Sequence, residues 1–349
     1  ESPAGVGFSA VAGQNYTTGD NQTSADALAF VQGLYEQVPW LRTRPLFLAG
    51  ESYAGHYVPQ LAQRVLDFNA HAPEGDKIPL VGVLTGNPST DFAFDFTYYY
   101  DFMQSHALIG AREYDHALSV CNGSLTNPAP ACKDLVKGFS AQFSQINPYN
   151  VLAPCIPGKP AKGGCLTRQL LSLGSAATRD SLAAAADLGA PMSQTYVPCM
   201  NYTAEIAYLN DPATRTALGV RADAPSWDVC SHALDYDQVA PSVLQLYPQF
   251  ASAGVRVLVY SGDVDSCVPY MGTERALDSL NLTISDAWRT WTLDDQVAGF
   301  TKTYTVPGTA ATITYATVRG AGHMVPSDSI GKPAAALLMY RQFVAGQPL

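Results

Sequence analysis

Charged residues are scarce in this 349-residue chain, and long apolar runs are absent. Asp, Glu, Lys and Arg together make up 14% of the residues, and the longest strand-like apolar run, residues 255–260, is interrupted by Arg256. No stretch approaches the ~18 uninterrupted apolar residues typical of a membrane-spanning helix. Basic residues number 20 against 30 acidic ones, for a net charge of −10. We therefore expect neither a membrane nor a nucleic acid as a partner, because the latter needs clustered Lys and Arg.

Metal-binding patterns are also lacking. The chain has no Cys-x-x-Cys pair and no His-Glu-x-x-His motif, so we expect no metal and no other cofactor. Its seven cysteines, at positions 121, 132, 155, 165, 199, 230 and 267, instead favour disulfides in an oxidising compartment. Because the count is odd, at least one cysteine has no disulfide partner within the chain.

Five Asn-x-Ser/Thr sequons complete the evidence on cellular location. They begin at Asn15, Asn21, Asn122, Asn201 and Asn281. One sequon alone is weak evidence, but five in a chain of low charge favour a glycoprotein that is secreted or delivered to a vacuole or lysosome.

Buried strands alternate with helical patterns near both ends of the chain. Apolar residues spaced by three and four, Phe30 among them, predict a helix that starts at Thr23 or Ser24 as its cap and stops before Pro39. A strand over 46–49, a turn over 50–55, a helix over 58–66 and a strand over 80–84 follow. Strands return at 255–260 and 312–318, before a helix from Pro333 to Phe343. This order predicts a parallel α/β sheet.

The middle of the chain differs in character. Six of the seven cysteines and an aromatic stretch from Phe92 to Phe102 lie between residues 92 and 237. We interpret 1–91 as the first part of the α/β core, 92–237 as a cap inserted into it, and 238–349 as the second part. Residues 156–195, rich in Gly, Ala, Ser and Lys, read as a mobile or excisable loop.

Three residues that can carry acyl-transfer chemistry follow the predicted strands. Ser52 lies in the strand–turn–helix segment, Asp265 follows the strand at 255–260, and His323 follows the strand at 312–318. The chain order Ser, Asp, His is that of the α/β-hydrolases. Serine becomes a nucleophile when a histidine removes its proton, and a carboxylate orients that histidine. Each segment alone also fits an ordinary turn, and we expect Asp263 to hold its turn rather than to act in catalysis.

The sequence motifs resemble those of the serine carboxypeptidase family of α/β-hydrolases. GESYAGHYVP at 50–59 and GAGHMVP at 320–326 are highly specific, and GDVD at 262–265 also matches. The stretch 291–300 around Asp294-Asp295-Gln296 looks most like the plant-type carboxypeptidase II branch. The resemblance implies an α/β-hydrolase fold in which Ser52 is the nucleophile, His323 the general base and Asp265 the acid. It also implies that the Tyr53 backbone N–H binds the oxyanion.

The same resemblance implies two substrate-binding residues. Glu51 would recognise the free C-terminal carboxylate of the substrate by sharing a proton with it, which favours acidic pH because one of two paired carboxyls must be protonated. Met324 would form a wall of the leaving-residue pocket, with ordinary core packing as its alternative. The residues Tyr98, Tyr99 and Tyr100 either line a cleft or divide between core and surface.

One departure from the family is large. The family's Trp-x-Asn-Gly-Gly-Pro-Gly-Cys-Ser-Ser segment does not occur in the 349 residues. It supplies the second oxyanion donor, and we expect the first strands of the sheet to be missing with it. The resemblance places Cys230 opposite the cysteine of that segment and implies the pairs Cys121–Cys132 and Cys155–Cys199. It leaves Cys165 and Cys267 unassigned, the latter either a free thiol near the site or a buried small side chain.

These observations predict a serine-type carboxypeptidase. Its substrates would be the C-termini of peptides or proteins, and the sequence leaves a homodimer open. One alternative is an acyltransferase of the same scaffold that uses sugar-ester donors; such relatives tend to carry Asp before the nucleophile, so Glu51 favours the peptidase. The other is a catalytically silent, truncated scaffold that binds partner proteins.

Overall fold

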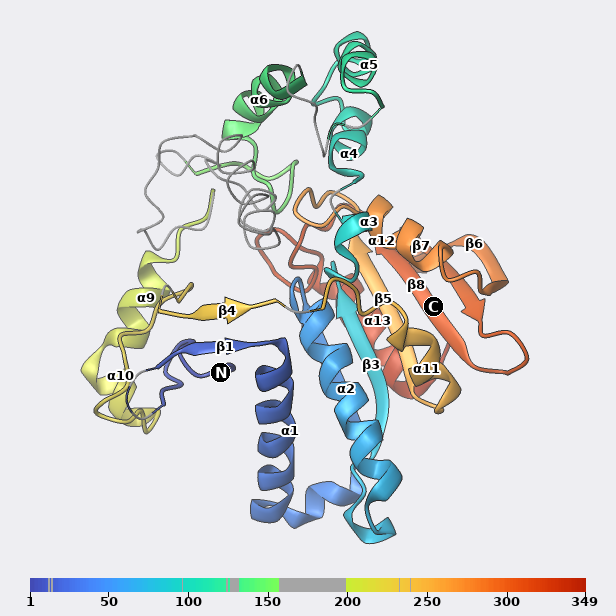
Figure 1. Ribbon diagram of the computed structural model, residues 1–349. Helices are drawn as coiled ribbons and strands as arrows, with labels where there is room; N and C mark the ends of the chain where they lie inside the picture. Colours follow the sequence, from blue (N-terminus) through green and yellow to red (C-terminus); the bar gives the residue numbers. More distant parts are fainter. Residues whose placement is uncertain are drawn as a thin grey trace.

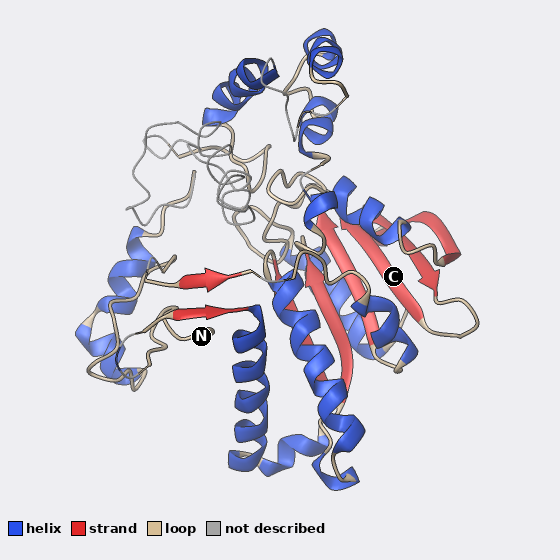
Figure 2. Ribbon diagram, viewed as in Figure 1, coloured by secondary structure: helices blue, strands red, loops and turns tan. Residues whose placement is uncertain are grey.

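A six-stranded sheet forms the centre of the molecule (Figures 1 and 2). The computed structural model describes residues 1–11, 13, 15–95, 97–123, 125, 132–156, 199–231, 233–238 and 240–349. The strands are β2 (Leu46–Glu51), β3 (Leu80–Gly86), β5 (Arg256–Gly262), β6 (Thr283–Leu293), β7 (Gln296–Thr305) and β8 (Thr312–Val318). Their order across the sheet is β2-β3-β5-β8-β7-β6. The first four are parallel, which confirms the predicted parallel sheet, and β7 and β6 are antiparallel.

The strand β5 shows why the apolar runs are continuous rather than alternating. Val257 and Val259 pack into the hydrophobic core on one face of the sheet, whereas Leu258 and Tyr260 pack into the core on the other. Successive side chains of a strand point to opposite faces, so a strand covered on both sides must be apolar at every position.

Helices cover both faces of the sheet. On one face lie α2 (Ala54–His71), α11 (Leu246–Ser252) and α12 (Tyr270–Asp278), and on the other lies α13 (Pro333–Ala345). The helix α13 contributes Ala335, Ala336 and Met339 to the second core and ends at Gly346 in the left-handed conformation, a common helix terminus. The crossover from β2 through α2 to β3 is the predicted strand–helix–strand unit.

The helix α1 (Asp20–Gln37) packs against α2, and two predictions about it are wrong. The helix begins four residues earlier than expected, after Gly19, so Thr23 and Ser24 lie inside it and do not cap it. Phe30, expected on the buried face, is 69% exposed, while Val31 and Tyr35 form the contact with α2. A short helix, η2 (Pro39–Thr43), follows.

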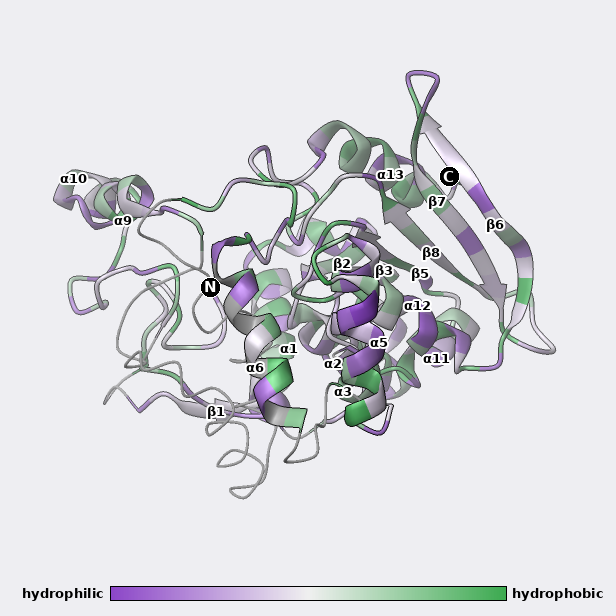
Figure 3. Cartoon of the chain, turned by 90° about the horizontal axis from the view of Figure 1, so that it is seen from above, coloured by the Kyte–Doolittle hydropathy of each residue, from purple (hydrophilic) through white to green (hydrophobic). Residues whose placement is uncertain are grey.

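The hairpin β6–β7 was not predicted from the sequence. Its first strand is largely solvent-exposed, and purple and green segments both occur along it (Figure 3). Asp294 and Asp295, which connect the strands, both have positive φ angles, 51° and 58°, as a type I′ hairpin turn requires. The Asp-Asp-Gln stretch, Asp294 to Gln296, is therefore the turn into β7, and it lies near the edge of the sheet opposite β2.

Three helices after β3 form their own small core: α4 (Tyr99–Ser105), α5 (Ala111–Val120) and α6 (Lys133–Gln142). The short helix α3 (Phe92–Asp95) precedes them and instead packs Phe94 against the core of the sheet. The disulfides Cys121–Cys132 and Cys155–Cys199 are present as expected. Tyr100 is buried in this core, so it belongs to the packing of the insertion. Residues 157–198, and with them Cys165 and almost all of the expected loop, lie outside the described residues.

Four further elements lie on the same side of the molecule as α1 in Figure 1: α9 (Thr203–Asn210), α10 (Pro212–Ala217), β1 (Thr17–Gly19) and β4 (Asp235–Asp237). Two short helices remain: η3 (Glu74–Asp76) lies between α2 and β3 in the chain, and η5 (Phe143–Gln145) follows α6. The strands β1 and β4 form a separate parallel pair. Among the described residues, no helix combines the length and hydropathy needed to cross a membrane.

Candidate active site

The segment after β2 is a sharp turn that presents Ser52. Ser52 has a φ of +62°, a conformation that costs a non-glycine residue free energy and that marks a strained strand-to-helix turn. Its N–H donates to the Gly86 carbonyl at 3.0 Å, and its carbonyl accepts from the Ser89 N–H at 3.0 Å. The turn also depends on glycine: a Cβ on Gly50 would lie 2.4 Å from the Ala54 Cβ.

Asp265 lies in the loop after β5 and is fully buried. Its Oδ1 accepts the Cys267 N–H at 2.7 Å, and its Oδ2 accepts the Val268 N–H at 3.2 Å. The same Oδ2 accepts the Asn87 Nδ2–H at 2.8 Å. These donors fix the carboxylate in one orientation and offset part of the cost of burying its charge.

Asn87 is a residue that the sequence reasoning missed. It is fully buried directly after β3, and its Oδ1 accepts the Gly262 N–H at 3.0 Å while its Nδ2 donates to Asp265. One side chain thus joins the end of β3 to the loop after β5. The signal was present, because a polar residue directly follows a buried parallel strand at the carboxyl edge of the sheet, where sites lie.

His323 follows β8 and is 4% exposed. Its Nδ1–H donates to Asp265 Oδ2 at 2.7 Å, which leaves Nε2 as the ring atom able to accept a proton. Burial lowers the pKa of His323, but the charge of Asp265, their hydrogen bond and the charge of Glu51 raise it, and the net pKa lies above the ordinary value. The structure therefore joins the predicted acid to the predicted base.

Ser52 and His323 line one pocket of about 330 Å³. Its other lining residues are largely aromatic and apolar: Tyr53, Tyr57, Tyr149, Leu234, Tyr236, Gln238, Cys267 and Val268. Tyr149 comes from the segment before residue 157, and its carbonyl accepts the His323 N–H at 2.7 Å. Tyr53 is the N-cap residue of α2, so its N–H lies at the positive end of an 18-residue helix.

Glu51 and Met324 do not line this pocket among the described residues. Glu51 is half-buried at the end of β2, and burial raises its pKa to about 7; the charge of His323 lowers it and that of Asp265 raises it. Met324 is half-buried directly after His323. Glu51 is close enough to His323 and Asp265 for their charges to change its pKa, and Met324 is the next residue after His323 in the chain. The substrate contacts of Glu51 and Met324 stay predictions.

Contacts resolve two further sequence predictions and show the role of one histidine. Asp263 holds its turn, because its Oδ1 accepts the Gly320 N–H at 2.6 Å. Cys267 is disulfide-bonded, so the alternative of a free thiol is wrong. His56 is fully buried between the rings of Tyr53 and Phe92, as a structural histidine is. Ligand-type atoms of Asp265, Cys267 and His323 lie within 4.8 Å of one another, but the disulfide occupies the sulfur, so the trio does not suit a metal ion.

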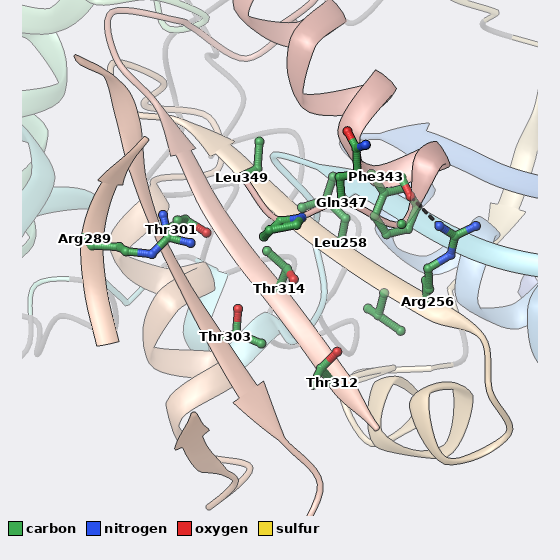
Figure 4. Close-up of a pocket in the computed structure, with 13 residues that line it drawn as sticks. Arg256, Leu258, Arg289, Thr301, Thr303, Thr312, Thr314, Phe343, Gln347 and Leu349 are labelled. Atoms are coloured by element: carbon green, nitrogen blue, oxygen red, sulfur yellow. Dashed lines mark hydrogen bonds between the residues drawn. The ribbon is translucent and has the colours of Figure 1, made fainter. Parts of the chain in front are cut away.

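A second pocket lies elsewhere on the sheet (Figure 4). It borders the first residues of β5 and β8 and the end of α13, whereas Ser52, Asp265 and His323 follow the opposite ends of their strands. Its arginines are already engaged: Arg256 donates to the Phe343 carbonyl at 2.8 Å, and Arg289 donates to Asp286 at 2.8 Å. The Ser52 pocket is therefore the stronger candidate for an active site.

Comparison with known proteins assigns the chain to a family. The sequence profile described as "Serine carboxypeptidase" matches residues 1–346. The chain belongs to the serine carboxypeptidase family. It is accordingly an enzyme of the serine carboxypeptidase type, and the resemblance drawn from its motifs is confirmed.

Plant serine carboxypeptidases are among its relatives. The chain is 33% identical to serine carboxypeptidase-like 21 of Arabidopsis thaliana, over all of this chain and 74% of that protein. It is 33% identical to serine carboxypeptidase 24 of the same plant, covering 72% of it. It is 31% identical to serine carboxypeptidase 1 of Hordeum vulgare, covering 73% of it.

A solved carboxypeptidase confirms the fold. The crystal structure of Kex1(delta)p, a prohormone-processing carboxypeptidase from Saccharomyces cerevisiae, matches with a TM-score of 0.66 at 18% identity. The match covers 98% of this chain and 73% of that one. The chain thus has the α/β-hydrolase fold of this family, with the disulfides in the region inserted after β3.

Proposed function

We propose that the protein releases C-terminal amino acids from peptides and proteins at acidic pH, with Ser52, His323 and Asp265 as its catalytic triad. The observation that carries the proposal is one pocket lined by Ser52 and by a histidine whose Nδ1 is held by a buried carboxylate. The left-handed turn at Ser52 adds support, because it lifts the hydroxyl clear of the strand.

The chemistry follows from the placement of each group. Ser52 Oγ attacks the carbonyl of the last peptide bond while His323 Nε2 accepts its proton. The Tyr53 N–H, at the start of α2, stabilises the oxyanion of the tetrahedral intermediate. His323 then protonates the amine of the leaving amino acid, and water, activated by the same imidazole, hydrolyses the acyl-enzyme. Asp265 orients the imidazole and stabilises the imidazolium through its hydrogen bond to Nδ1.

Glu51 supplies the preference for a chain end. Because burial raises the pKa of Glu51 to about 7, its carboxyl is protonated in acid and donates a hydrogen bond to the substrate carboxylate. Above that pH it ionises and repels the same carboxylate. Substrate binding should therefore weaken as the pH rises through about 7. The charge of Glu51 is one of the causes that raise the pKa of His323, so protonation of Glu51 in acid removes that cause and favours the unprotonated imidazole. The acidic limit of the reaction is reached where His323 is protonated in spite of this.

The cellular setting of this activity is the secretory pathway. Two disulfides in the inserted region need an oxidising compartment. The asparagines of the five sequons, Asn15, Asn21, Asn122, Asn201 and Asn281, are all solvent-exposed, as glycosylation requires. A secreted or vacuolar glycoprotein that works in acid fits both features.

The test is release of the terminal amino acid from an N-blocked dipeptide by the full-length protein, in acid and at neutral pH. We expect faster release in acid and its loss in Ser52→Ala, with unchanged circular dichroism. Ser119→Ala, which replaces an exposed serine of α5, is the matched control and should keep wild-type activity. Retained activity in Ser52→Ala would remove Ser52 as the nucleophile.

Two other outcomes decide between the alternatives. Labelling of Ser52 by a fluorophosphonate without amino-acid release would favour acyl transfer, and sugar-ester donors would then be assayed with the same variants. A folded protein that neither labels nor turns over would favour the silent scaffold. Glu51 at the position before the nucleophile supports the peptidase over the acyltransferase.

A further inference from the structure

Asp20 is a buried carboxylate beside the pocket that the mechanism does not use. It is the first residue of α1 and is fully inaccessible to solvent. Its Oδ1 accepts the Tyr53 hydroxyl at 2.9 Å and the Tyr236 hydroxyl at 2.9 Å. Its Oδ2 accepts the Ala240 N–H at 3.2 Å. The residue is thus bound to two segments that are distant from it in sequence, one at Tyr53 and the other at Tyr236 and Ala240.

Hydrogen-bond donors surround the carboxyl group of Asp20. Three donors and the positive end of an 18-residue helix meet its two oxygens. Burial, followed by the charge of Asp20, raises the pKa of Tyr53, and burial, Tyr57 and Asp20 raise that of Tyr236. Both hydroxyls therefore keep their protons and remain donors to the carboxylate at any pH at which the enzyme works.

The two tyrosines are parts of the pocket wall. Tyr53 follows Ser52 directly and carries the backbone N–H proposed for the oxyanion, while its ring lines the pocket. Tyr236 belongs to the strap, which we define as residues 234–238, and Leu234 and Gln238 of the strap line the pocket with it. The rings of Tyr53 and Tyr236 are in edge contact, with centroids 5.9 Å apart.

The strap is also fixed beside Asp20 through the backbone. Thr17, Thr18 and Gly19 pair in parallel with Asp235, Tyr236 and Asp237. Gly19 approaches so closely that a Cβ on it would lie 2.5 Å from the Asp237 carbonyl oxygen. The backbone pairing therefore sets where the strap runs, and the carboxylate of Asp20 sets where the Tyr236 ring points.

We propose that Asp20 is a positioning residue that fixes both the nucleophile turn, through Tyr53, and the strap wall of the pocket, through Tyr236. This inference rests on the proposed function of the Ser52 site. One oxygen atom holds both hydroxyls, so loss of the carboxylate releases the two walls together. Release of Tyr53 acts on kcat, because it loosens the backbone that carries the oxyanion donor. Release of Tyr236 acts on KM, because it loosens a wall that contacts the substrate.

The experiment separates these effects with three variants of the full-length protein: Asp20→Asn, Tyr53→Phe and Tyr236→Phe. For each, kcat and KM for an N-blocked dipeptide and the rate of fluorophosphonate labelling of Ser52 are measured. We expect Asp20→Asn to lower kcat/KM by roughly 10- to 100-fold, because the amide oxygen holds the two hydroxyls without a negative charge and the amide NH2 faces the Ala240 N–H with a second donor, which strands it. We expect Tyr53→Phe to lower kcat and the labelling rate, and Tyr236→Phe to raise KM while labelling stays near that of the wild type.

A double variant tests whether Asp20 acts through Tyr53. In a Tyr53→Phe background, Asp20→Asn should lower the labelling rate much less than it does in the wild type. Tyr304→Phe is the matched control: the Tyr304 hydroxyl donates to Asp278 at 2.7 Å in another part of the molecule. It should lower thermal stability and leave kcat, KM and labelling unchanged.

Several results would overturn the proposal. The proposal fails if the Asp20→Asn and Tyr53→Phe losses of labelling rate are additive in the double variant. It also fails if Asp20→Asn lowers the melting temperature but leaves kcat, KM and the labelling rate unchanged. If Asp20→Asn does not fold, the two tyrosine variants decide, and wild-type kinetics in both would reject the inference. Failure of the proposed function looks different, because the wild type would then label at Ser52 and release no amino acid. In that case the labelling rates of the variants alone would test the positioning role of Asp20.

Discussion

The two sides of the pocket are held in different ways. On the acid–base side, Asp265 and His323 follow β5 and β8, interior strands of the sheet, and both side chains are buried. The Asp265 carboxylate accepts side-chain donors from Asn87 and His323 as well as two backbone N–H groups. Nearly every atom that sets the geometry of this pair is shielded from water.

On the nucleophile side, Ser52 follows β2, which pairs only with β3 among the described residues. The strand is half-buried along most of its length, with Ala49 exposed, and Ser52 is itself half-buried. Backbone hydrogen bonds to Gly86 and Ser89 hold the turn, and the link from Asp20 to Tyr53 adds one side-chain bond.

The difference teaches where each side is sensitive. Changes on the acid–base side strand a buried charge or a buried donor, which is costly. Changes on the nucleophile side shift a turn that water can reach, so their effects should be graded. The predictions that follow test this contrast.

Replacing the acid should have the largest effect. We expect Asp265→Asn to lower kcat on the order of 10⁴-fold, because the amide favours the wrong tautomer of His323 and no longer stabilises the imidazolium. Kinetics of dipeptide hydrolysis measure this loss. A fall of less than tenfold would show that the His323–Asp265 bond of the structure is not catalytic.

Asn87 should rank next. We expect Asn87→Ala to lower kcat by roughly 10- to 100-fold, because it leaves the buried Gly262 N–H without its acceptor and frees one side of Asp265. Asn87→Asp places a second carboxyl 2.8 Å from Asp265 Oδ2, and two buried carboxyls this close cannot both ionise. Asp265 then shares its negative charge with the new carboxyl, so the pKa of His323 should fall and the acidic limb of the kcat profile should move to lower pH. The two profiles measure this, and an unmoved limb in Asn87→Asp would contradict a role through the acid–base pair.

Glu51→Gln addresses the nucleophile side. In the wild type, KM for a free C-terminus should rise as the pH passes about 7, approaching tenfold per unit as Glu51 ionises. The glutamine is neutral at every pH, so this rise should disappear, and discrimination against C-terminal amides should weaken. KM values for the acid and the amide on both sides of that pH measure it. Equal pH dependence in both proteins would remove Glu51 from carboxylate recognition.

Replacing Asp95 should have the smallest effect, and this effect should be on the free energy of unfolding. It accepts the Ser89 hydroxyl at 2.7 Å, in the loop whose Ser89 N–H holds the Ser52 carbonyl. Burial raises its pKa to about 7, despite hydrogen bonds that lower it. The folded state therefore binds a proton more tightly than the unfolded chain, and stability falls as the pH rises from about 4 to about 7.

Asp95→Asn cannot ionise and should lose this fall, by on the order of 1–3 kcal/mol. Urea unfolding at several pH values measures the difference between variant and wild type. Asp115→Asn, at an exposed position of α5, is the matched control. A parallel pH dependence in the wild type and in Asp95→Asn would contradict the shift.

Much of the site follows from sequence because its residues are tied to local patterns. The runs 255–260 and 312–318 are apolar because their strands lie in the sheet centre, and 46–49 is a short apolar run bounded by a turn, so the ends of all three, and with them Ser52, Asp265 and His323, are visible in the chain. The parallel order of those strands also follows, because the crossover rules leave few alternatives.

The features that the sequence analysis missed depend on contacts between distant segments of the chain. Asn87 and Asp20 each bind partners far along the chain, and no local pattern indicates which polar side chains turn inward. The β6–β7 hairpin escaped because its first strand is exposed and lacks a buried run. Phe30 was placed in a core because periodicity alone does not say whether anything packs against a face.

The pairing of β3 with β5 has a consequence for the order of events during folding. The Asn87–Asp265 bond joins residues 178 positions apart, and the whole inserted region lies between them. Contacts of such sequence separation form late, because the loop-closure entropy is lost before they stabilise the chain. The chain therefore gains its acid and base only after the central strands have met. The site is therefore complete only when the two parts of the core on either side of the inserted region have paired.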